Sequence, residues 1–364
     1  MPVIWCAISG HGYGHAAQLI PILNELGHRR PDLLVHLRTS LPQKFFQDQL
    51  HVPWTLDRRE QDVGCVQRGP LEIDVDKTWQ EYARFHAQWE QAVEYEAACM
   101  ERRQPDLVLS NISYLATAAG ALAHRPTVAI GNLSWDRVLL HLDPHGAERR
   151  QDVIAHIRRA YGGARSMIRL HPAIDPVPFA SVVEVGPIYG PARTSRGVVR
   201  SRLGAQPTDR IVLVACGGVP LDPLPIERLD SLTGYHIIVG GLDLPHRSGR
   251  VSTATAFGLP FCQILAEADI VITKPGYATI VDVVRYGIPV VYVRRYNFVD
   301  EECLVGYLHR YGRGVELSRE KFLACDWSEA LRDVQALPPP QQLPPTSGVA
   351  EAVSIIDDYL VTQA

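Results

Sequence analysis

The sequence predicts an α/β protein built from two doubly wound, parallel-sheet domains. Short apolar runs alternate with helical patterns along most of the 364 residues, as in consecutive βαβ units. A glycine-bearing turn follows the first apolar run of each half, at residues 10–15 and 216–218. A stretch of small, Arg and Pro residues between 186 and 207 separates the two halves.

The composition excludes several classes of protein. A hydrophobic content of 46% and a charged content of 21% are typical of a globular chain. The net charge of -4 gives no basic field for nucleic acid. The seven cysteines form no CxxC pair, so neither a disulfide framework nor a structural zinc site is expected. Because the sequence has no secretory core and no apolar run that could span a bilayer, we expect a cytoplasmic protein with at most peripheral membrane contact.

The first half begins with a buried strand over residues 3–9 and a helix over 16–26. Residues 77–103 combine Ala, Glu and Gln with spaced aromatic residues, and they predict one long helix that Pro105 ends. Further elements are predicted as strands at 33–37, 107–110 and 127–131 and a helix at 116–123.

The second alternating series begins with a strand at 211–215. It continues through strands at 236–239, 268–272 and 290–293. A polyproline segment at 338–345 then precedes an amphipathic helix at 349–360. We therefore expect domains at 1–190 and 191–345, with a C-terminal helix within 346–364 that returns to the first domain.

The turn at residues 10–15 reads Gly-His-Gly-Tyr-Gly-His, which fits neither a dinucleotide fingerprint nor a Walker loop. Gly12 and Gly14 leave room for a substrate, and His15 falls in the first helical turn, where the helix dipole lowers the pKa of an imidazole. A general base must be unprotonated, so we predict that His15 is the base, with His11, Gly12 and Gly14 beside the acceptor. The histidines could instead only cap the helix. A metal ion between His11 and His15 is a further alternative, for which the sequence offers no third ligand.

A second turn, Lys-Pro-Gly-Tyr-Ala-Thr at residues 274–279, joins a strand to a helix in the second half. Open α/β sheets bind ligands at the carboxyl ends of strands, and helix N-termini favour phosphate. The 216–218 turn offers further N–H groups, or its glycines serve loop geometry alone. Asp282 is placed to bind a ribose diol, with a solvated helix acid as the alternative. The predicted donor-binding residues here are Gly217, Gly218, Lys274, Pro275, Gly276, Tyr277, Thr279 and Asp282.

Polar residues also follow two other predicted strands. Asp300 and Glu301 come after the strand at 290–293, where they either hold sugar hydroxyls of the donor or cap the next helix. Ser134 and Asp136 follow a strand of the first half, and we predict that they line the acceptor side.

These motifs resemble those of GT-B glycosyltransferases, with the peptidoglycan N-acetylglucosaminyltransferases as the well-studied comparison. Residues 274–276, Thr279, Asp282 and residues 287–289 are similar to that family's donor segment, in which an acid binds the ribose of a uridine nucleotide. The chain also resembles, over nearly its whole length, the N-terminal glycosyltransferase-like part of arabinokinase-type sugar kinases. The motifs that carry this second resemblance are at residues 10–16, 132–136, 168–170, 293–296 and 314–316. The kinase domain of that larger family is absent from this sequence, so we carry over no kinase activity.

The resemblance implies a GT-B fold, with two Rossmann-like parallel-sheet domains facing across a cleft. It implies a metal-independent glycosyltransferase that takes a nucleotide-diphosphate sugar, such as a UDP-sugar, as donor and needs no cofactor. His15 would deprotonate a hydroxyl of a small-molecule, lipid or protein acceptor. Two alternatives use the same cleft: a nucleotide-sugar hydrolase or epimerase, and a non-catalytic regulator that binds a nucleotide sugar.

Overall fold

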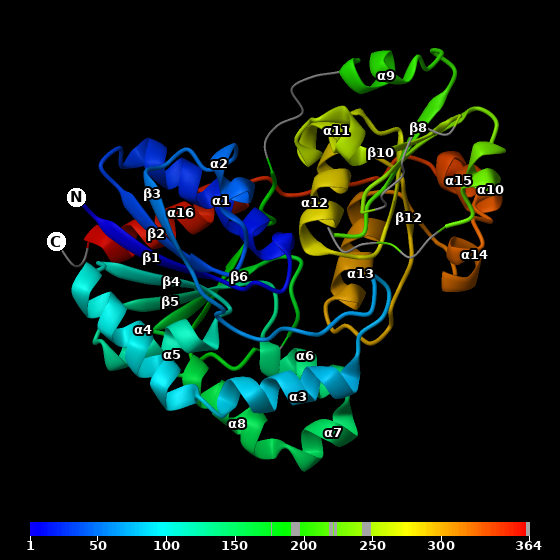
Figure 1. Cartoon of the computed structure of the whole chain (residues 1–364). Helices are drawn as coiled ribbons and strands as arrows, with labels where there is room; N and C mark the ends of the chain where they lie inside the picture. The colour runs from blue at the N-terminus through cyan, green and yellow to red at the C-terminus, as the bar shows by residue number, and fades with distance from the viewer. Residues whose placement is uncertain (176, 191–196, 218–220, 222–223, 242–248, 362–364) are drawn as a thin grey trace.

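The computed structural model describes residues 1–364 except 176, 191–196, 218–220, 222–223, 242–248 and 362–364. The chain forms two lobes, each built around one parallel sheet (Figure 1). We call the lobe with β1–β7 the first lobe and the lobe with β8–β13 the second lobe. The predicted fold class is therefore confirmed. The proposed boundary after residue 190 falls at 191–196, outside the described residues, and it stays a prediction.

The first sheet has seven parallel strands in the order β3-β2-β1-β4-β5-β6-β7. The order in which the chain adds strands reverses between β1 and β4, which are parallel neighbours with Ile8 paired to Asn111. The central strands are apolar and buried along their length, as expected for a sheet covered on both faces. The strands are β1 (Val3–Ile8), β2 (Leu34–Thr39), β3 (Trp54–Arg58), β4 (Leu107–Asn111), β5 (Thr127–Gly131), β6 (Ser166–Leu170) and β7 (Val182–Val185).

The second sheet has six parallel strands in the order β10-β9-β8-β11-β12-β13. The order of strand addition reverses between β8 and β11, so the two sheets share one topology. The strands are β8 (Arg210–Val214), β9 (Tyr235–Val239), β10 (Val251–Thr253), β11 (Ile270–Thr273), β12 (Val290–Tyr292) and β13 (Gly314–Glu316).

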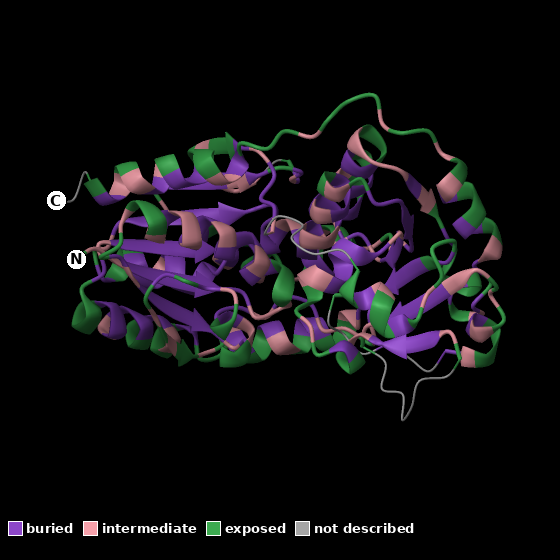
Figure 2. Ribbon diagram, turned by 90° about the horizontal axis from the view of Figure 1, so that it is seen from above, coloured by how far each residue is buried: buried purple, intermediate pink, exposed green. Residues whose placement is uncertain are grey.

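Helices cover both sheets and turn their polar faces outward, while the strands between them are buried (Figure 2). Helices of the first lobe are α1 (Tyr13–Arg29), α2 (Gln43–Gln47), α3 (Val75–His86), α4 (Trp89–Arg103), α5 (Tyr114–Leu122), α6 (Trp135–Leu142), α7 (Pro144–Arg149) and α8 (Gln151–Tyr161). Those of the second lobe are α9 (Val198–Leu203), α10 (Ile226–Asp230), the 3-10 helix η1 (Ala254–Phe257), α11 (Phe261–Glu267), α12 (Tyr277–Tyr286), α13 (Glu301–Tyr311), α14 (Arg319–Leu323) and α15 (Ser328–Ala336). Among the described residues, no helix is both long and apolar enough to cross a bilayer.

The single long helix predicted at 77–103 is wrong, because α3 ends at His86 and α4 begins at Trp89. The break lets aromatic side chains from both helices pack around Tyr114 of α5. The ring of Trp89 stacks on that of Tyr114, with centroids 5.3 Å apart, and Phe85 meets the same ring edge-on at 5.8 Å. Tertiary packing here overrides a pattern that local helix propensity alone would continue.

The last helix, α16 (Gly348–Val361), packs against the first lobe, on α1 and β7. Figure 1 shows it in red beside the blue N-terminal elements. Asp357 forms an ion pair with Arg30 of the first lobe. The Tyr359 hydroxyl lies 2.9 Å from Ser166 Oγ, and Glu351 accepts a hydrogen bond from the Gly186 amide at 2.8 Å. The chain therefore crosses between the lobes a second time before it ends.

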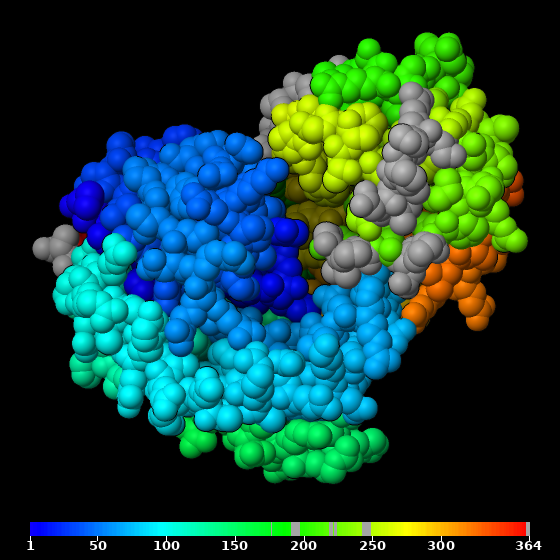
Figure 3. Space-filling model, in the orientation of Figure 1, coloured from blue at the N-terminus to red at the C-terminus, as the bar shows by residue number. Residues whose placement is uncertain are grey.

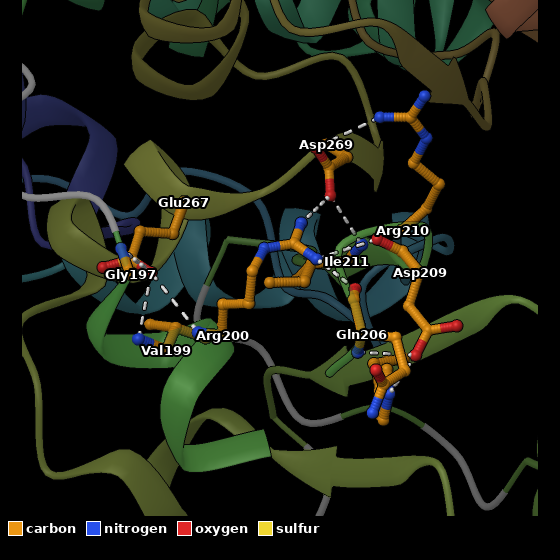
Figure 4. A network of polar contacts seen from close by, with 10 residues as sticks. Gly197, Val199, Arg200, Gln206, Asp209, Arg210, Ile211, Glu267 and Asp269 are labelled. Atoms are coloured by element: carbon orange, nitrogen blue, oxygen red, sulfur yellow. Dashed lines mark hydrogen bonds and ion pairs between the residues drawn. The ribbon is translucent and has the colours of Figure 1, made fainter. Parts of the chain in front are cut away.

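A buried carboxylate anchors α9, the first helix of the second lobe (Figure 4). Glu267, at the end of α11, accepts hydrogen bonds from the amides of residues 197–200, at 2.9–3.4 Å. Arg200 then pairs with Asp269 at 2.7 Å, and Asp269 also accepts from the Ile211 amide. The orphan N–H groups of the first turn of α9 are thus satisfied by an acid from another element.

Candidate active site

The carboxyl edges of the two sheets border a gap between the lobes. Figure 3 shows a hollow there, with the dark-blue N-terminal segment on one wall and yellow segments of the second lobe on the other. The switch point of each sheet lies at such an edge, where ligands bind in open α/β folds. A Cβ atom added to Gly12 or Gly14 would meet no atom within 4 Å, so the start of α1 borders open space.

His15 is in the first turn of α1, and its ring reaches across the switch point to β4. Its Nδ1 lies 2.9 Å from Oδ1 of Asn111, the last residue of β4. Because Nδ2 of Asn111 donates to Gln18 at 3.0 Å, the Asn111 oxygen faces the imidazole. Nδ1 of His15 therefore carries the proton, and the lone pair of Nε2 is left for another partner.

Burial lowers the pKa of His15 to about 4, against the opposite effect of its hydrogen bond to Asn111. The residue is only 9% exposed, so its charged form is poorly solvated. At neutral pH the imidazole is unprotonated and can accept a proton at Nε2. This is the protonation state predicted from the sequence, although burial rather than the helix dipole is its main cause.

His11 lies in a different environment from His15. Its Nδ1 accepts a hydrogen bond from the Cys65 amide at 3.1 Å, and its ring meets Trp135 edge-on with centroids 5.3 Å apart. Burial, followed by the charges of neighbouring groups, lowers its pKa well below the usual value. The imidazole is therefore a packed, neutral group. Its predicted acceptor contact stays a prediction.

The opposite wall is formed by the turns after β8 and β11. Gly217 has φ +77°, a left-handed conformation that suits glycine, and a Cβ there would lie 3.8 Å from Lys274 Nζ. Lys274 donates to Oε1 of Gln67 in the first lobe at 3.3 Å. Burial, with help from the nearby charge of Arg295, lowers the pKa of Lys274 to about 8. The predicted residue Gly218 lies outside the described residues.

The N-terminus of α12 has no side-chain cap and no acidic residue in its first turn. Pro275 and Gly276 form the turn before α12, and Thr279 is in its first turn. These predicted donor-binding residues therefore all lie at the N-terminus of α12. Tyr277 differs from the other predicted residues of this turn because its hydroxyl already has protein partners. Its buried hydroxyl accepts from the Ile188 amide at 3.1 Å and donates to the His171 carbonyl at 2.8 Å, so it joins α12 to the first lobe.

The three predicted acids of the second lobe have different partners. Asp300 Oδ2 accepts from Asn132 Nδ2 at 3.2 Å, whereas its Oδ1 is buried without a partner among the described residues. Glu301 accepts from the amides of residues 295 and 296 and from the Arg295 side chain, so its carboxylate organises the loop after β12. Asp282 accepts from the Gly190 amide at 2.8 Å, and burial raises its pKa to about 6. Of these three acids, Asp300 alone has a buried oxygen without a hydrogen-bond partner among the described residues.

Ser134 and Asp136 are buried at the start of α6. The Ser134 hydroxyl donates to Asp136 at 2.7 Å, and Asp136 also pairs with Arg158 of α8 at 2.7 Å. Both side chains thus stabilise the first lobe. Their predicted contact with an acceptor stays a prediction.

Arg295 is a functional candidate that the sequence reading did not single out. Its guanidinium is buried, donates to Glu301 at 2.7 Å and lies 4.3 Å from the centroid of the Phe298 ring. Its charge affects both Lys274 and Asp300. The sequence feature that could have indicated Arg295 is the pair of adjacent arginines directly after the strand predicted at 290–293.

Two pockets lie away from the gap. A pocket of about 460 Å³ is at the amino edge of the second sheet, and one of about 370 Å³ lies between β2, β3 and α4. Parallel sheets bind ligands at their carboxyl edges, whereas the first pocket lies at an amino edge and the second lies between a sheet face and α4, so neither pocket is the candidate site. Among the described residues, no group of three or more His, Cys, Asp or Glu side chains could hold a metal ion.

Two parallel-sheet lobes of one topology, facing across a gap and joined by a returning C-terminal helix, define the GT-B fold. Solved glycosyltransferases have the same fold as this chain. The glycosyltransferase of kitacinnamycin has a TM-score of 0.62 at 15% identity, covering 99% of this chain and 95% of that one. MurG of Acinetobacter baumannii has a TM-score of 0.51 at 12% identity, covering 98% and 100%. A spinosyn rhamnosyltransferase complexed with thymidine diphosphate has a TM-score of 0.53 at 16% identity, covering 100% and 96%.

A curated relative agrees with the second resemblance found in the sequence. The chain is 27% identical over 339 residues to the L-arabinokinase of Arabidopsis thaliana, which covers 91% of this chain and 32% of that protein. The chain therefore spans about a third of the length of that relative. No protein-family model matches the chain. Both resemblances, to the GT-B fold and to arabinokinase-type proteins, are confirmed.

Proposed function

We propose that this protein is a glycosyltransferase that moves a sugar from a nucleotide diphosphate to an acceptor hydroxyl. One observation carries the proposal. The first lobe carries an unprotonated histidine, His15, at the carboxyl edge of its sheet, and its Nε2 has no hydrogen-bond partner among the described residues. The second lobe carries a buried lysine and arginine and an uncapped helix N-terminus at the carboxyl edge of its own sheet. A proton acceptor on one side and anion-binding groups on the other are what glycosyl transfer from a diphosphate needs.

Each wall of the gap then has one chemical task. The diphosphate would lie against Gly217, Lys274 and the first-turn amides of α12, whose positive charge stabilises the departing group. Asp300 Oδ1 would accept a hydroxyl of the donor sugar. His15 Nε2 would take the proton of the acceptor hydroxyl as the new bond forms. In this scheme Lys274, Arg295 and backbone amides supply the positive charge that a metal ion supplies in other transferases.

The first measurement is which nucleotide the protein binds. One solved neighbour carries thymidine diphosphate, and the donor segment resembles one that binds uridine, so both bases belong in the test. Thermal unfolding would be followed with UDP, dTDP, GDP and their sugars, with and without EDTA. A ligand at one hundred times its Kd stabilises the native state by about 2.7 kcal/mol, which a thermal shift detects. Failure of every activated sugar to bind would overturn the proposal.

Product analysis then separates transfer from the alternatives. The diphosphate and sugar products would be measured by mass spectrometry with and without a panel of hydroxyl acceptors. We expect release of the nucleotide diphosphate to depend on the acceptor. Release at the same rate in water alone would indicate a hydrolase, and binding with no turnover would indicate a regulator.

A further inference from the structure

Four hydrogen bonds link His15 in the first lobe to Asp300 in the second through three amide side chains. His15 Nδ1 lies 2.9 Å from Asn111 Oδ1, and Asn111 Nδ2 donates to Gln18 Oε1 at 3.0 Å. Gln18 Nε2 donates to Asn132 Oδ1 at 2.8 Å, and Asn132 Nδ2 donates to Asp300 Oδ2 at 3.2 Å. All five side chains belong to buried residues. We call this set the amide chain.

The amide chain has a direction, and Asp300 sets it. An ionised carboxylate can only accept, so Asn132 must turn its NH2 group toward Asp300 and its oxygen toward Gln18. The same constraint passes to Gln18 and then to Asn111, which turns its oxygen toward the imidazole. His15 must then present an N–H at Nδ1. A charge on one lobe thereby decides which nitrogen of a histidine on the other lobe carries the proton.

We propose that Asp300 is a positioning residue that fixes the tautomer and orientation of His15 through the amide chain. The last bond, from Asn132 to Asp300, crosses between the lobes, so the base is aligned only when the lobes are seated together. Asp300 Oδ1 is buried and has no partner among the described residues. It is therefore free for the donor, and one carboxylate contacts the donor sugar with one oxygen while it orients the base with the other. The catalytic consequence rests on the proposed function, whereas the tautomer does not.

The tautomer can be measured without any substrate. Protein carrying ¹⁵N-labelled histidine would be examined by NMR near pH 7.5, with the His15 signals assigned by their loss in His15→Gln. We expect the Nδ1–H tautomer in the wild type. Asp300→Asn keeps the shape but can donate as well as accept, so the tautomers should become mixed, and Asp300→Leu should disorder the ring further. Glu302→Gln, which removes an exposed carboxylate two residues away, is the matched control and should change nothing. An unchanged His15 tautomer in both Asp300 variants overturns the proposal.

The kinetic test exchanges the amide of Asn111 and the carboxylate of Asp300 between their two positions in the amide chain. Asn111→Asp places an acceptor-only group directly against His15 Nδ1–H, but with Asp300 intact both ends of the chain only accept, and one contact must fail. Adding Asp300→Asn supplies a donor at the far end and lets every bond form in the reversed direction. We expect Asp300→Asn alone to lower kcat by on the order of tenfold and the double variant to regain most of it. If Asp300 served only as a donor ligand, the defect would be a raised donor KM that persists in the double variant, and that result would refute the proposal. If no variant or wild type transfers a sugar, the proposed function fails while the NMR result still decides the role of Asp300.

Discussion

The ring of His11 lies nearly parallel to the ring of Phe298 from the other lobe, with an interplanar angle of 5° and centroids 6.0 Å apart. The contact places the first histidine of the 10–15 turn in the seam between the lobes. Its Nδ1 already accepts from a backbone amide. A Cβ on Gly64 would come within 2.5 Å of the ring, so the imidazole fits tightly. His11 therefore contributes to the packing between the lobes, whereas His15 is the proton acceptor in the proposed mechanism.

The two histidines should respond differently to the same substitution. We expect His15→Gln to lower kcat by about 10²–10⁴-fold with little change in donor binding, the range that general-base catalysis supplies. His11→Gln should lower stability and alter KM more than kcat, because it weakens the contact with Phe298 but leaves the base in place. Steady-state kinetics and thermal unfolding of the two variants check this. Loss of kcat in His11→Gln with near-normal turnover in His15→Gln would reverse the assignment.

The change of kcat near pH 6 should report the ionisation of Asp300 rather than that of His15. Burial raises the pKa of Asp300 to about 6, while the charges of Arg295 and Lys274 and the hydrogen bond from Asn132 oppose the shift and Glu301 adds to it. Burial lowers the pKa of His15 to about 4. Asp300 must be ionised to orient the amide chain, so kcat should rise as the pH rises through about 6. A second, lower limb near pH 4 belongs to protonation of the base, because the proton occupies the nitrogen that must accept.

The measurement is a kcat profile between pH 4.5 and 8 for the wild type and Asp300→Asn. The limb near pH 6 should vanish in the variant, whose lower rate should stay nearly flat over this range because His15 titrates below it. The comparison is needed because burial also raises the pKa of Asp62 to about 7 and that of Asp282 to about 6. A limb near pH 6 that survives in Asp300→Asn would assign it to one of those carboxyl groups. Circular dichroism at each pH confirms that the protein is folded.

The parts of the fold and of the candidate site that could be predicted from the sequence are those that depend on residues close together in the chain. The alternation of strands and helices and the glycine turns are local, so the fold and the placement of His15 at a helix start followed from them. Asn111 could not be found that way, since it reaches His15 only because β4 lies beside β1, a neighbour that is not consecutive in the chain. The surroundings of the acidic side chains could not be predicted from the sequence either. The sequence predicts Glu301 and Asp282 as donor-binding acids, yet each carboxylate accepts a hydrogen bond from a backbone amide of another segment.

Lys274 should make donor binding depend on pH in the alkaline range. Burial lowers its pKa to about 8, so the ammonium is lost as the pH rises above that value, and with it the attraction for a diphosphate. We expect the Kd of the nucleotide diphosphate to increase between pH 7 and 9. Lys274→Met should raise Kd by about tenfold or more at pH 7, since hydrogen bonds to charged groups contribute about 1.5–3 kcal/mol, and it should abolish the pH dependence. Isothermal titration calorimetry tests this, with the exposed Lys77→Met as control. Equal affinities for Lys274→Met and wild type would remove Lys274 from the diphosphate site.

Glu267 should be the carboxylate on which the start of the second lobe depends. It is buried and accepts from the amides that open α9 (Figure 4), so Glu267→Ala leaves several N–H groups without a partner. We expect a loss of about 2 kcal/mol in unfolding free energy, comparable to the loss of a strong helix cap. Glu267→Gln keeps one acceptor oxygen and should lose less. Hydrogen exchange read by mass spectrometry should show faster exchange confined to residues 197–203 in Glu267→Ala. The control is Glu320→Ala, which removes an exposed acid from the first turn of α14 in the same lobe. If both alanine variants exchange and unfold alike, the buried carboxylate has no special part in holding α9.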